Sequence, residues 1–352
     1  MFDMTVAAMH GGTDALGVPA HDFSTNRNAC GPCPMAVKAL QAAHVAQYPD
    51  PHYTQLLAQL AAFHGVAVER IVIGGSSSEL IHRITLHAVR SGAKNVFFPP
   101  HHYGDYLQAA RVWRLALCRR AEVSTLPALS WACEPSSPLG VQEDIWPAWS
   151  KAPSQQEWRG LDCAYRPLWL EGEAPQRSLD SVWQLWTPNK ALGMTGIRAA
   201  YAIAPLHAAA AELKALRDLA ASWVVGSHGV AMLQAWVSDE VQQWLAQSLV
   251  TLRRWKAQQL ALCAKLGWQV VAGHQANYFV VRLPLDDIAA PLAAMRAQGV
   301  KLRDCASFGL PGHARLGVLP PVSQAALERA WLSIQGSLKD ASNDLATQTP
   351  HA

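Results

Sequence analysis

The sequence predicts an α/β fold in which helices cover both faces of a mostly parallel sheet, followed by a smaller α/β domain. Short apolar runs alternate with helical stretches through the first two thirds of the chain. Such runs are typical of strands buried on both faces, and alternation with helices is typical of parallel sheets. The length of 352 residues exceeds one ordinary domain and favours a large and a small lobe. The predicted strands of the large lobe are residues 71–73, 95–98, 114–118, 128–133, 161–164, 182–186 and 199–203.

The segments outside this alternation divide the chain further. Residues 1–34 are rich in Gly, Pro and Asn, whereas helical periodicity dominates 35–46, 54–63 and most of 205–266. The second lobe is predicted to have strands at 268–271, 277–282, 300–303 and 314–318, and helices at 286–298 and from 323. We therefore expect an arm (1–34) that contributes to the small domain and the functional site, a large domain (35–220), a small domain (221–338) and a disordered polar tail (339–352).

Composition excludes several classes of protein. The net charge of +3 and the lack of a basic block argue against nucleic acid as a partner. No run of eighteen apolar residues could span a membrane, and the first residues lack the basic region of a signal peptide. Seven scattered cysteines favour a reducing compartment, so we expect a cytoplasmic protein.

The most informative segment is residues 187–198, a polar stretch between two predicted strands. It contains Lys190 and, eight positions later, Arg198. Burial disfavours the charged form of a lysine, so the amine can become a nucleophile toward a carbonyl. An enzyme that carries pyridoxal phosphate (PLP) on a lysine needs such an amine, and an arginine nearby can bind the cofactor phosphate.

A second candidate phosphate site follows the predicted strand 71–73. There the sequence Gly-Gly-Ser-Ser-Ser-Glu opens a helix, and free backbone N–H groups with small side chains favour a phosphate beside Ser77 and Ser78. A structural alternative is a capping box between Ser76 and Glu79, which are three residues apart.

Other predicted strand ends carry polar or aromatic side chains. Asp162 could pair with the pyridine nitrogen of PLP, and Tyr165 could donate to its phenolate oxygen. Tyr103 could stack on the pyridine ring. Taken singly, an aspartate that ends a strand is more often a turn residue, and Tyr103 is equally well a rim aromatic that packs on its own turn.

The remaining polar features are Arg303 and Arg315 in the small lobe and a Cys-Gly-Pro-Cys stretch in the arm. The two arginines flank a loop and could hold the anionic ends of a substrate. Cys30 and Cys33 have the spacing of a redox motif, but the irregular arm before them is not the usual strand, which favours coincidence. No metal site is expected, since the adjacent His101 and His102 project in different directions.

Taken in order, these features resemble the class I/II aminotransferase family of fold-type I PLP enzymes. The resemblance spans roughly residues 10–337. Within that family, the H-G-G at residues 10–12 and D-F-S-T-N-R-N at 22–28 are similar to threonine-phosphate decarboxylases of cobalamin biosynthesis, as are Y-P-D-P at 48–51 and L-R-D-C at 302–305.

The resemblance implies a role for each candidate residue. Lys190, Asp162 and Tyr165 would be the catalytic residues, and Arg315 would hold the substrate carboxylate. The implied cofactor-binding residues are Ser77, Ser78, Tyr103, Ser137, Thr187, Asn189, Arg198 and Tyr48. Tyr48 would come from the partner subunit, which implies a homodimer. The implied substrate-binding residues are His10, Gly11, Asn26, Arg303 and Arg315.

The chain also departs from the family pattern. E-P-S-S-P-L-G at residues 134–140 stands where the family commonly has N-P-N-N-P-T-G, so Ser137 replaces an asparagine. A hydroxyl donates one proton where an amide donates two. Ser78 replaces an acidic residue and Asn189 a Ser or Thr, and the spacing from Gly140 to Lys190 is short.

The function implied first is PLP-dependent decarboxylation of L-threonine O-3-phosphate to aminopropanol phosphate. The alternative is an aminotransferase of the histidinol-phosphate type, in which Lys190 moves the Cα proton. A third interpretation is a non-catalytic homologue that only holds the cofactor. The arm sequence favours the decarboxylase, and the altered E-P-S-S-P-L-G stretch weakens it.

Overall fold

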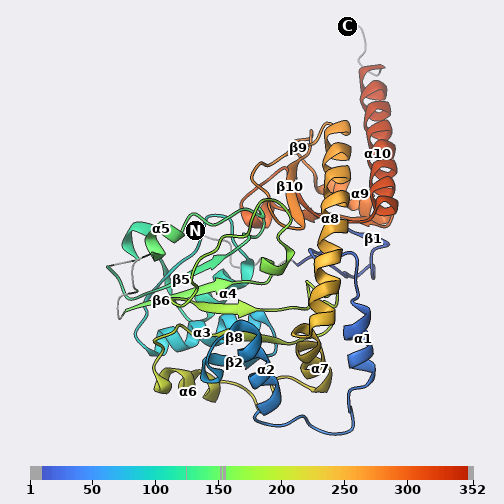
Figure 1. The fold of residues 1–352 in the computed structure, drawn as a ribbon. Helices are drawn as coiled ribbons and strands as arrows, with labels where there is room; N and C mark the ends of the chain where they lie inside the picture. Colours follow the sequence, from blue (N-terminus) through green and yellow to red (C-terminus); the bar gives the residue numbers. More distant parts are fainter. Residues whose placement is uncertain (1–9, 124, 151–152, 154–155, 348–352) are drawn as a thin grey trace.

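The large domain is built on a seven-stranded sheet whose strands run mostly in parallel, as predicted (Figure 1). The computed structural model describes residues 10–347 apart from 124, 151–152 and 154–155. The strand order is β2-β8-β7-β6-β5-β3-β4, and only β8 runs antiparallel to its neighbours. The strands are β2 (Ile71–Gly74), β3 (Asn95–Phe97), β4 (Ala116–Leu117), β5 (Ala128–Cys133), β6 (Glu157–Asp162), β7 (Trp183–Trp186) and β8 (Ala200–Ile203).

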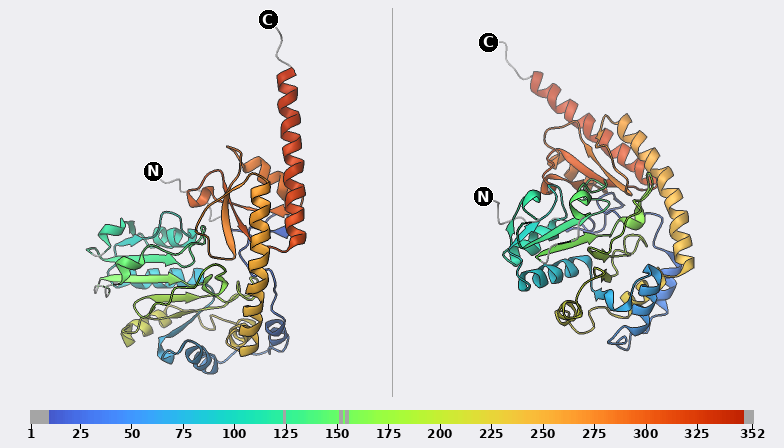
Figure 2. Two further views of the ribbon diagram at one scale, coloured as in Figure 1. Left: turned by 45° about the horizontal axis from the view of Figure 1, so that its top comes forward. Right: turned by 60° about the vertical axis from the view of Figure 1, so that its left-hand side comes forward.

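Helices cover both faces of this sheet (Figure 2). The first face packs on α3 (Ser77–Arg90), α4 (Gly104–Val112) and α6 (Ala210–Asp218). The second face packs on α1 (Pro34–Gln41), α2 (Thr54–His64), α7 (Ser227–Trp236) and the long α8 (Asp239–Lys265), with α5 (Trp146–Trp149) near β5 and β6. Successive residues of β2 point to opposite faces of the sheet. Val72 packs on the helices of the first face, and Ile71 and Ile73 pack on those of the second.

The small domain has a four-stranded antiparallel sheet in the order β12-β13-β10-β9. Its strands are β9 (Gln269–Val270), β10 (Tyr278–Arg282), β12 (Arg303–Asp304) and β13 (His313–Gly317), and its helices are α9 (Ala289–Ala297) and α10 (Pro321–Thr347). The arm strand β1 (His21–Asp22) pairs in parallel with β11 (Val300–Lys301), which ties the arm to this domain.

Helix α10 continues to Thr347, into the segment 339–352 that was expected to be disordered. Residues 339–347 contain neither Pro nor Gly, so no helix breaker ends α10 before them. Residues 348–352 lie outside the described part of the chain. Within that part, no helix combines the length and apolar character needed to cross a lipid bilayer.

A close packing arrangement supports the middle of the large sheet. Trp131 on β5 lies opposite Gly160 on β6, and a Cβ added to Gly160 would lie 2.2 Å from the Trp131 ring. On its other side Trp131 stacks on Tyr106, with ring centroids 5.3 Å apart. The Tyr106 hydroxyl donates to the Asp162 carboxylate at 3.3 Å. The missing side chain at Gly160 therefore leaves room for the aromatic stack beneath Asp162.

We predict that Gly160→Ala lowers the free energy of unfolding by about 1–3 kcal/mol, because the added methyl group overlaps the Trp131 ring. Urea unfolding followed by circular dichroism measures this change. Gly336→Ala is the matched control, because Gly336 lies in α10 and a Cβ there meets no heavy atom within 4 Å. It should leave stability unchanged or raise it by up to about 1 kcal/mol. Equal destabilisation by the two variants would contradict this packing argument.

Candidate active site

A cavity of about 950 Å³ opens where the large domain, the small domain and the arm meet. The carboxyl ends of β5, β6 and β7 reach it through Cys133, Asp162 and Thr187. Ligand sites in open α/β sheets form at this edge. The predicted site residues that line the cavity are His10, Gly11, Asn26, Ser77, Ser78, Tyr103, Ser137, Asp162, Tyr165, Thr187, Asn189, Lys190, Arg198, Arg303 and Arg315.

Tyr48 is the predicted site residue that does not line this cavity. Its side chain is 77% exposed and stacks on Trp223, with ring centroids 4.4 Å apart. The sequence assigned Tyr48 to the site of a partner subunit, and that assignment stays a prediction.

Lys190 lies on the turn segment between β7 and β8, as the sequence predicted. Its Nζ is 4.5 Å from the centre of the Tyr165 ring. Burial alone would lower the pKa of Lys190, but Tyr165 and Asp162 outweigh it and hold the pKa above its ordinary value. Burial thus acts on the pKa in the direction expected from the sequence, but that argument left out the opposing effect of Tyr165 and Asp162.

The arm braces the backbone on which Lys190 sits. The backbone N–H of Asn28 donates to the Lys190 carbonyl at 2.8 Å. Its side-chain Nδ2 donates to the Ala191 carbonyl and to Ser248 Oγ on α8, at 3.0 and 2.7 Å. The backbone N–H of Cys33 donates to the Leu192 carbonyl. The arm therefore connects the lysine segment with the long helix α8.

Asp162 closes β6 and is almost fully buried. One carboxylate oxygen accepts from the Ala164 backbone N–H at 2.9 Å, and the other accepts from the Tyr106 hydroxyl. Burial raises the pKa of Asp162, while the charge of Lys190 and these two donors act in the opposite direction. A cation brought next to Asp162 would stabilise its charged form.

The N-terminus of α3 presents Ser77 and Ser78 to the cavity. Ser76 caps the helix by accepting the Glu79 N–H, whereas the Glu79 carboxylate accepts from the Gly75 N–H, so only half of the expected capping box forms. The cap leaves the next two hydroxyls available: Ser77 Oγ is buried without a hydrogen-bond partner among the described residues, and Ser78 Oγ lies 3.4 Å from the Tyr103 hydroxyl. Arg198 and Thr187 line the same cavity, which makes this region a candidate phosphate site.

Arg303 and Arg315 enter the cavity from neighbouring strands of the small sheet, where they are direct register partners. Arg315 donates to Ser137 Oγ at 3.3 Å and to the Ser24 carbonyl at 3.1 Å. Arg303 donates to Ser307 Oγ at 2.7 Å. Burial, and then the charge of Arg315, lower the pKa of Arg303. Both guanidinium groups lie near the Phe308 ring, 4.7 and 5.6 Å from its centre.

Several residues of the site were missed in the sequence. Asn28 braces the lysine segment, while Cys133, Phe308 and Arg111 line the cavity. Cys133 had a usable signal, because it ends the predicted strand 128–133 and pairs in register with Asp162. The arm cysteines lack the acidified thiol that is typical of redox motifs, because burial raises the pKa of Cys30 to about 11 and also raises that of Cys33.

Comparisons with known proteins agree with this geometry. The family model for aminotransferase class I and II matches residues 182–334. The histidinol-phosphate aminotransferase of Hyphomonas neptunium is 27% identical over 334 residues, which are 88% of each chain. The chain is similar to the aminotransferase class I and II family. It is a PLP-dependent enzyme, as in that family.

Solved structures share the fold. Histidinol-phosphate aminotransferase from Sinorhizobium meliloti, solved in complex with pyridoxal-5'-phosphate, has a TM-score of 0.73 at 21% identity and covers 88% of this chain and 90% of its own. L-threonine-O-3-phosphate decarboxylase from Porphyromonas gingivalis has a TM-score of 0.68 at 18% identity and covers 86% and 94%. The family model and the fold confirm the predicted fold-type I architecture and the cofactor.

The side chains of the cavity fit this cofactor. The buried hydroxyl of Ser77 lacks a partner among the described residues, and Arg198 supplies positive charge at the same cavity. A phosphate bound there would satisfy both groups. The carboxylate of Asp162 suits a protonated ring nitrogen, and Lys190 suits an aldehyde.

A second carboxyl behind the cavity should make stability depend on pH. Burial raises the pKa of Glu143 to about 8, from the value of 4.5 for a free glutamate, although the Cys133 N–H donates to it at 3.3 Å. Between these two values the folded protein keeps a proton that the unfolded chain releases. Stability therefore falls as pH rises, by about 1.4 kcal/mol per pH unit for this group.

We predict that Glu143→Gln removes the contribution of Glu143 to the fall in the free energy of unfolding between pH 5 and pH 8. Glutamine has no carboxyl proton to lose. Urea unfolding at several pH values should show the stability of the variant gaining on that of the wild type as pH rises. Glu173→Gln, at an exposed position, should not change the slope. Parallel curves for wild type and Glu143→Gln would contradict the raised pKa.

Proposed function

We propose that the protein transfers the amino group of a small phosphorylated amine to a 2-oxo acid, in the manner of histidinol-phosphate aminotransferase. The observation that carries this proposal is the joint placement of Lys190 and Asp162 in one cavity with two arginines that can hold anions. The curated relatives named histidinol-phosphate aminotransferase, from Hyphomonas neptunium and from Symbiobacterium thermophilum, are both 27% identical and support it.

On this proposal, PLP when bound supplies an electron sink conjugated to the substrate Cα. Lys190 attaches the cofactor covalently and then carries a proton to and from Cα. Asp162 keeps the ring nitrogen protonated, and Tyr103 packs against the ring. Tyr165 and Ser137 donate to the ring oxygen. The cofactor phosphate is held by Ser77, Ser78, Thr187, Asn189 and Arg198, together with Tyr48 from a second copy of the chain.

The substrate side of the cavity is formed by the arm and the small domain. Arg315 holds a substrate carboxylate, and Arg303 supplies the second positive charge for a phosphate or a second carboxylate. His10, Gly11 and Asn26 close the cavity from the arm. An amino donor such as glutamate and a phosphorylated amine both carry anions that this pair can bind in turn.

A second candidate function is decarboxylation of threonine phosphate. The arm favours it, because the H-G-G and D-F-S stretches resemble those decarboxylases and place His10, Gly11 and Asn26 at the cavity. The same cofactor serves both reactions, and the bond held perpendicular to the ring decides which one breaks. The decarboxylase keeps the carboxylate bond in that position, whereas the aminotransferase places the Cα proton there.

One assay distinguishes the two reactions. Purified enzyme loaded with PLP is given histidinol phosphate and 2-oxoglutarate, or threonine phosphate alone. Glutamate formation that requires 2-oxoglutarate supports the aminotransferase. Release of CO₂ and aminopropanol phosphate without a 2-oxo acid selects the decarboxylase and overturns the first proposal. Lys190→Ala should lower either rate by about 10²–10⁴-fold or more, because its proton transfer is lost.

We further predict that Arg315→Ala raises the KM of the substrate by roughly 10- to 100-fold while cofactor affinity changes little, because a charge-assisted hydrogen bond contributes about 1.5–3 kcal/mol. Steady-state kinetics and a cofactor titration measure the two effects. Arg282→Ala is the matched control, since Arg282 is an exposed residue of the same sheet. An unchanged KM in Arg315→Ala would place the substrate carboxylate elsewhere.

A further inference from the structure

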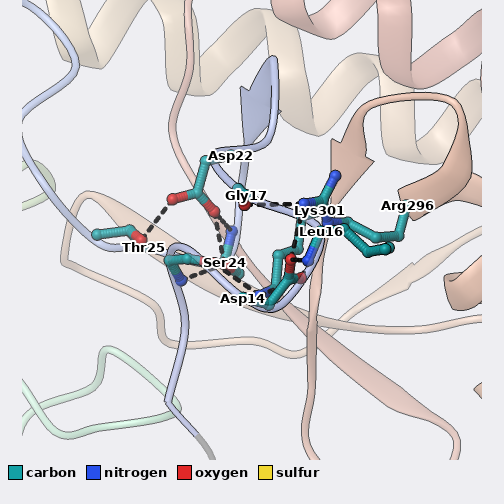
Figure 3. A network of polar contacts seen from close by, with 9 residues as sticks. Asp14, Leu16, Gly17, Asp22, Ser24, Thr25, Arg296 and Lys301 are labelled. Atoms are coloured by element: carbon teal, nitrogen blue, oxygen red, sulfur yellow. Dashed lines mark hydrogen bonds and ion pairs between the residues drawn. The ribbon is translucent and has the colours of Figure 1, made fainter.

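In addition to the pairing of β1 with β11, an ion-pair cluster around Asp14 links the arm to the small domain (Figure 3). Asp14 does not line the cavity. Asp14 forms a bidentate ion pair with Arg296 of α9. Arg296 Nη2 lies 2.7 Å from Asp14 Oδ1, and Arg296 Nε lies 2.9 Å from Asp14 Oδ2. Lys301 of β11 adds a second cation, 2.8 Å from Oδ2. Arg296 also donates to the Gly17 carbonyl, which fixes the turn from Asp14 to Gly17.

This cluster differs from an ordinary surface ion pair. The Arg296 and Lys301 side chains are only 13% and 16% exposed, and Asp14 is 31% exposed. Hydrogen bonds from Arg296, and then from Lys301, hold the pKa of Asp14 far below its usual range. The carboxylate therefore stays charged throughout the working range of pH. The bidentate contact with Arg296 and the second contact with Lys301 fix the orientation of the Asp14 carboxylate, which a single exposed ion pair does not.

A chain of hydrogen bonds leads from this cluster to the substrate side of the cavity. Lys301 Nζ also donates to the Gly12 carbonyl at 2.6 Å, and the Gly12 N–H donates to Ser24 Oγ at 2.8 Å. The Ser24 hydroxyl in turn donates to Asp22. The carbonyl of Ser24 accepts from Arg315 at 3.1 Å. Only four hydrogen-bonded steps thus separate Asp14 from the arginine proposed to hold the substrate carboxylate.

The adjoining part of the arm is tightly packed at Gly11. A Cβ at Gly11 would lie 2.1 Å from the Ser24 carbonyl oxygen. Beyond Gly11, His10 reaches across to the large domain, with Nε2 3.8 Å from Asp105 of α4 and its ring 6.0 Å from that of Tyr103. The arm therefore crosses the cavity from the small to the large domain.

We propose that Asp14 is a positioning residue for the substrate. With Arg296 and Lys301 it holds the arm so that His10, Gly11 and Ser24 form the wall of the cavity beside Arg315. This inference rests on the proposed function, which supplies the substrate. The contacts on which it depends join Asp14 to residues more than 280 positions later in the chain. The lysine segment on the cofactor side is braced by a later part of the arm, through Asn28 and Cys33, so we expect the cluster to act mainly on the substrate side.

The test is Asp14→Asn, which removes the charge and keeps the shape. The KM of the amino substrate should rise at least about 10-fold while kcat changes less than about 3-fold, because a misplaced wall weakens substrate binding. Cofactor affinity and absorbance should match the wild type. In the protein without PLP, amide hydrogen exchange in the peptide 10–26 should accelerate.

Two further variants and a control complete the test. Asp14→Glu should restore much of the wild-type KM, and Lys301→Met should reproduce a smaller KM effect if Asp14→Asn does not fold. Glu328→Gln breaks a different ion pair of the small domain, with Lys265, and should change neither KM nor exchange in the arm.

An unchanged KM in both Asp14→Asn and Lys301→Met would overturn the inference. A parallel loss of cofactor affinity, kcat and substrate affinity would also overturn it, because that result indicates a purely structural role. Unaccelerated exchange in the arm would overturn it independently of turnover. A wild-type enzyme without turnover on any amine would instead overturn the proposed function.

Discussion

The cavity of this protein contains far more positive than negative charge. Among the described side chains that line it, the one carboxylate is Asp162, and the cations are Arg111, Lys190, Arg198, Arg303 and Arg315. Removing such cations from water is costly unless anions accompany them. Arg315 Nε also lacks a hydrogen-bond partner among the described residues. The site is therefore built to be completed by anionic ligands, which explains why a phosphorylated cofactor and acidic substrates suit it.

The fold assembles this charge by bringing together chain segments that are distant in sequence. Parallel strands place Cys133, Asp162 and Thr187 at one edge, and the small sheet adds Arg315 from the opposite side. Beneath Asp162, the stacked rings of Trp131 and Tyr106 form a rigid floor. The carboxylate is thus fixed by packing as well as by hydrogen bonds.

Much of this could be predicted from the sequence, for physical reasons that are specific to each element. Strand β5 was predicted with its observed bounds because all its residues are buried and apolar runs mark such strands. Lys190 and Asp162 were found because each follows a strand-like run. The Asp14 cluster was not found, because ion pairs between the arm and α9 leave no local pattern. The effect of Asp162 and Tyr165 on the pKa of Lys190 was not predicted, because it depends on how closely the three side chains pack in the folded protein.

Ser137, which stands where the family commonly has an asparagine, bears on the choice between transamination and decarboxylation. Ser137 Oγ accepts from Arg315, so its position is tied to the arginine proposed for the substrate carboxylate. Its single proton remains to be donated to one acceptor, where an asparagine would offer two. The groups proposed to hold the cofactor are otherwise all present at the cavity. On the proposed function, Arg315, Arg303 and the arm are therefore the groups that would decide which bond of the substrate breaks.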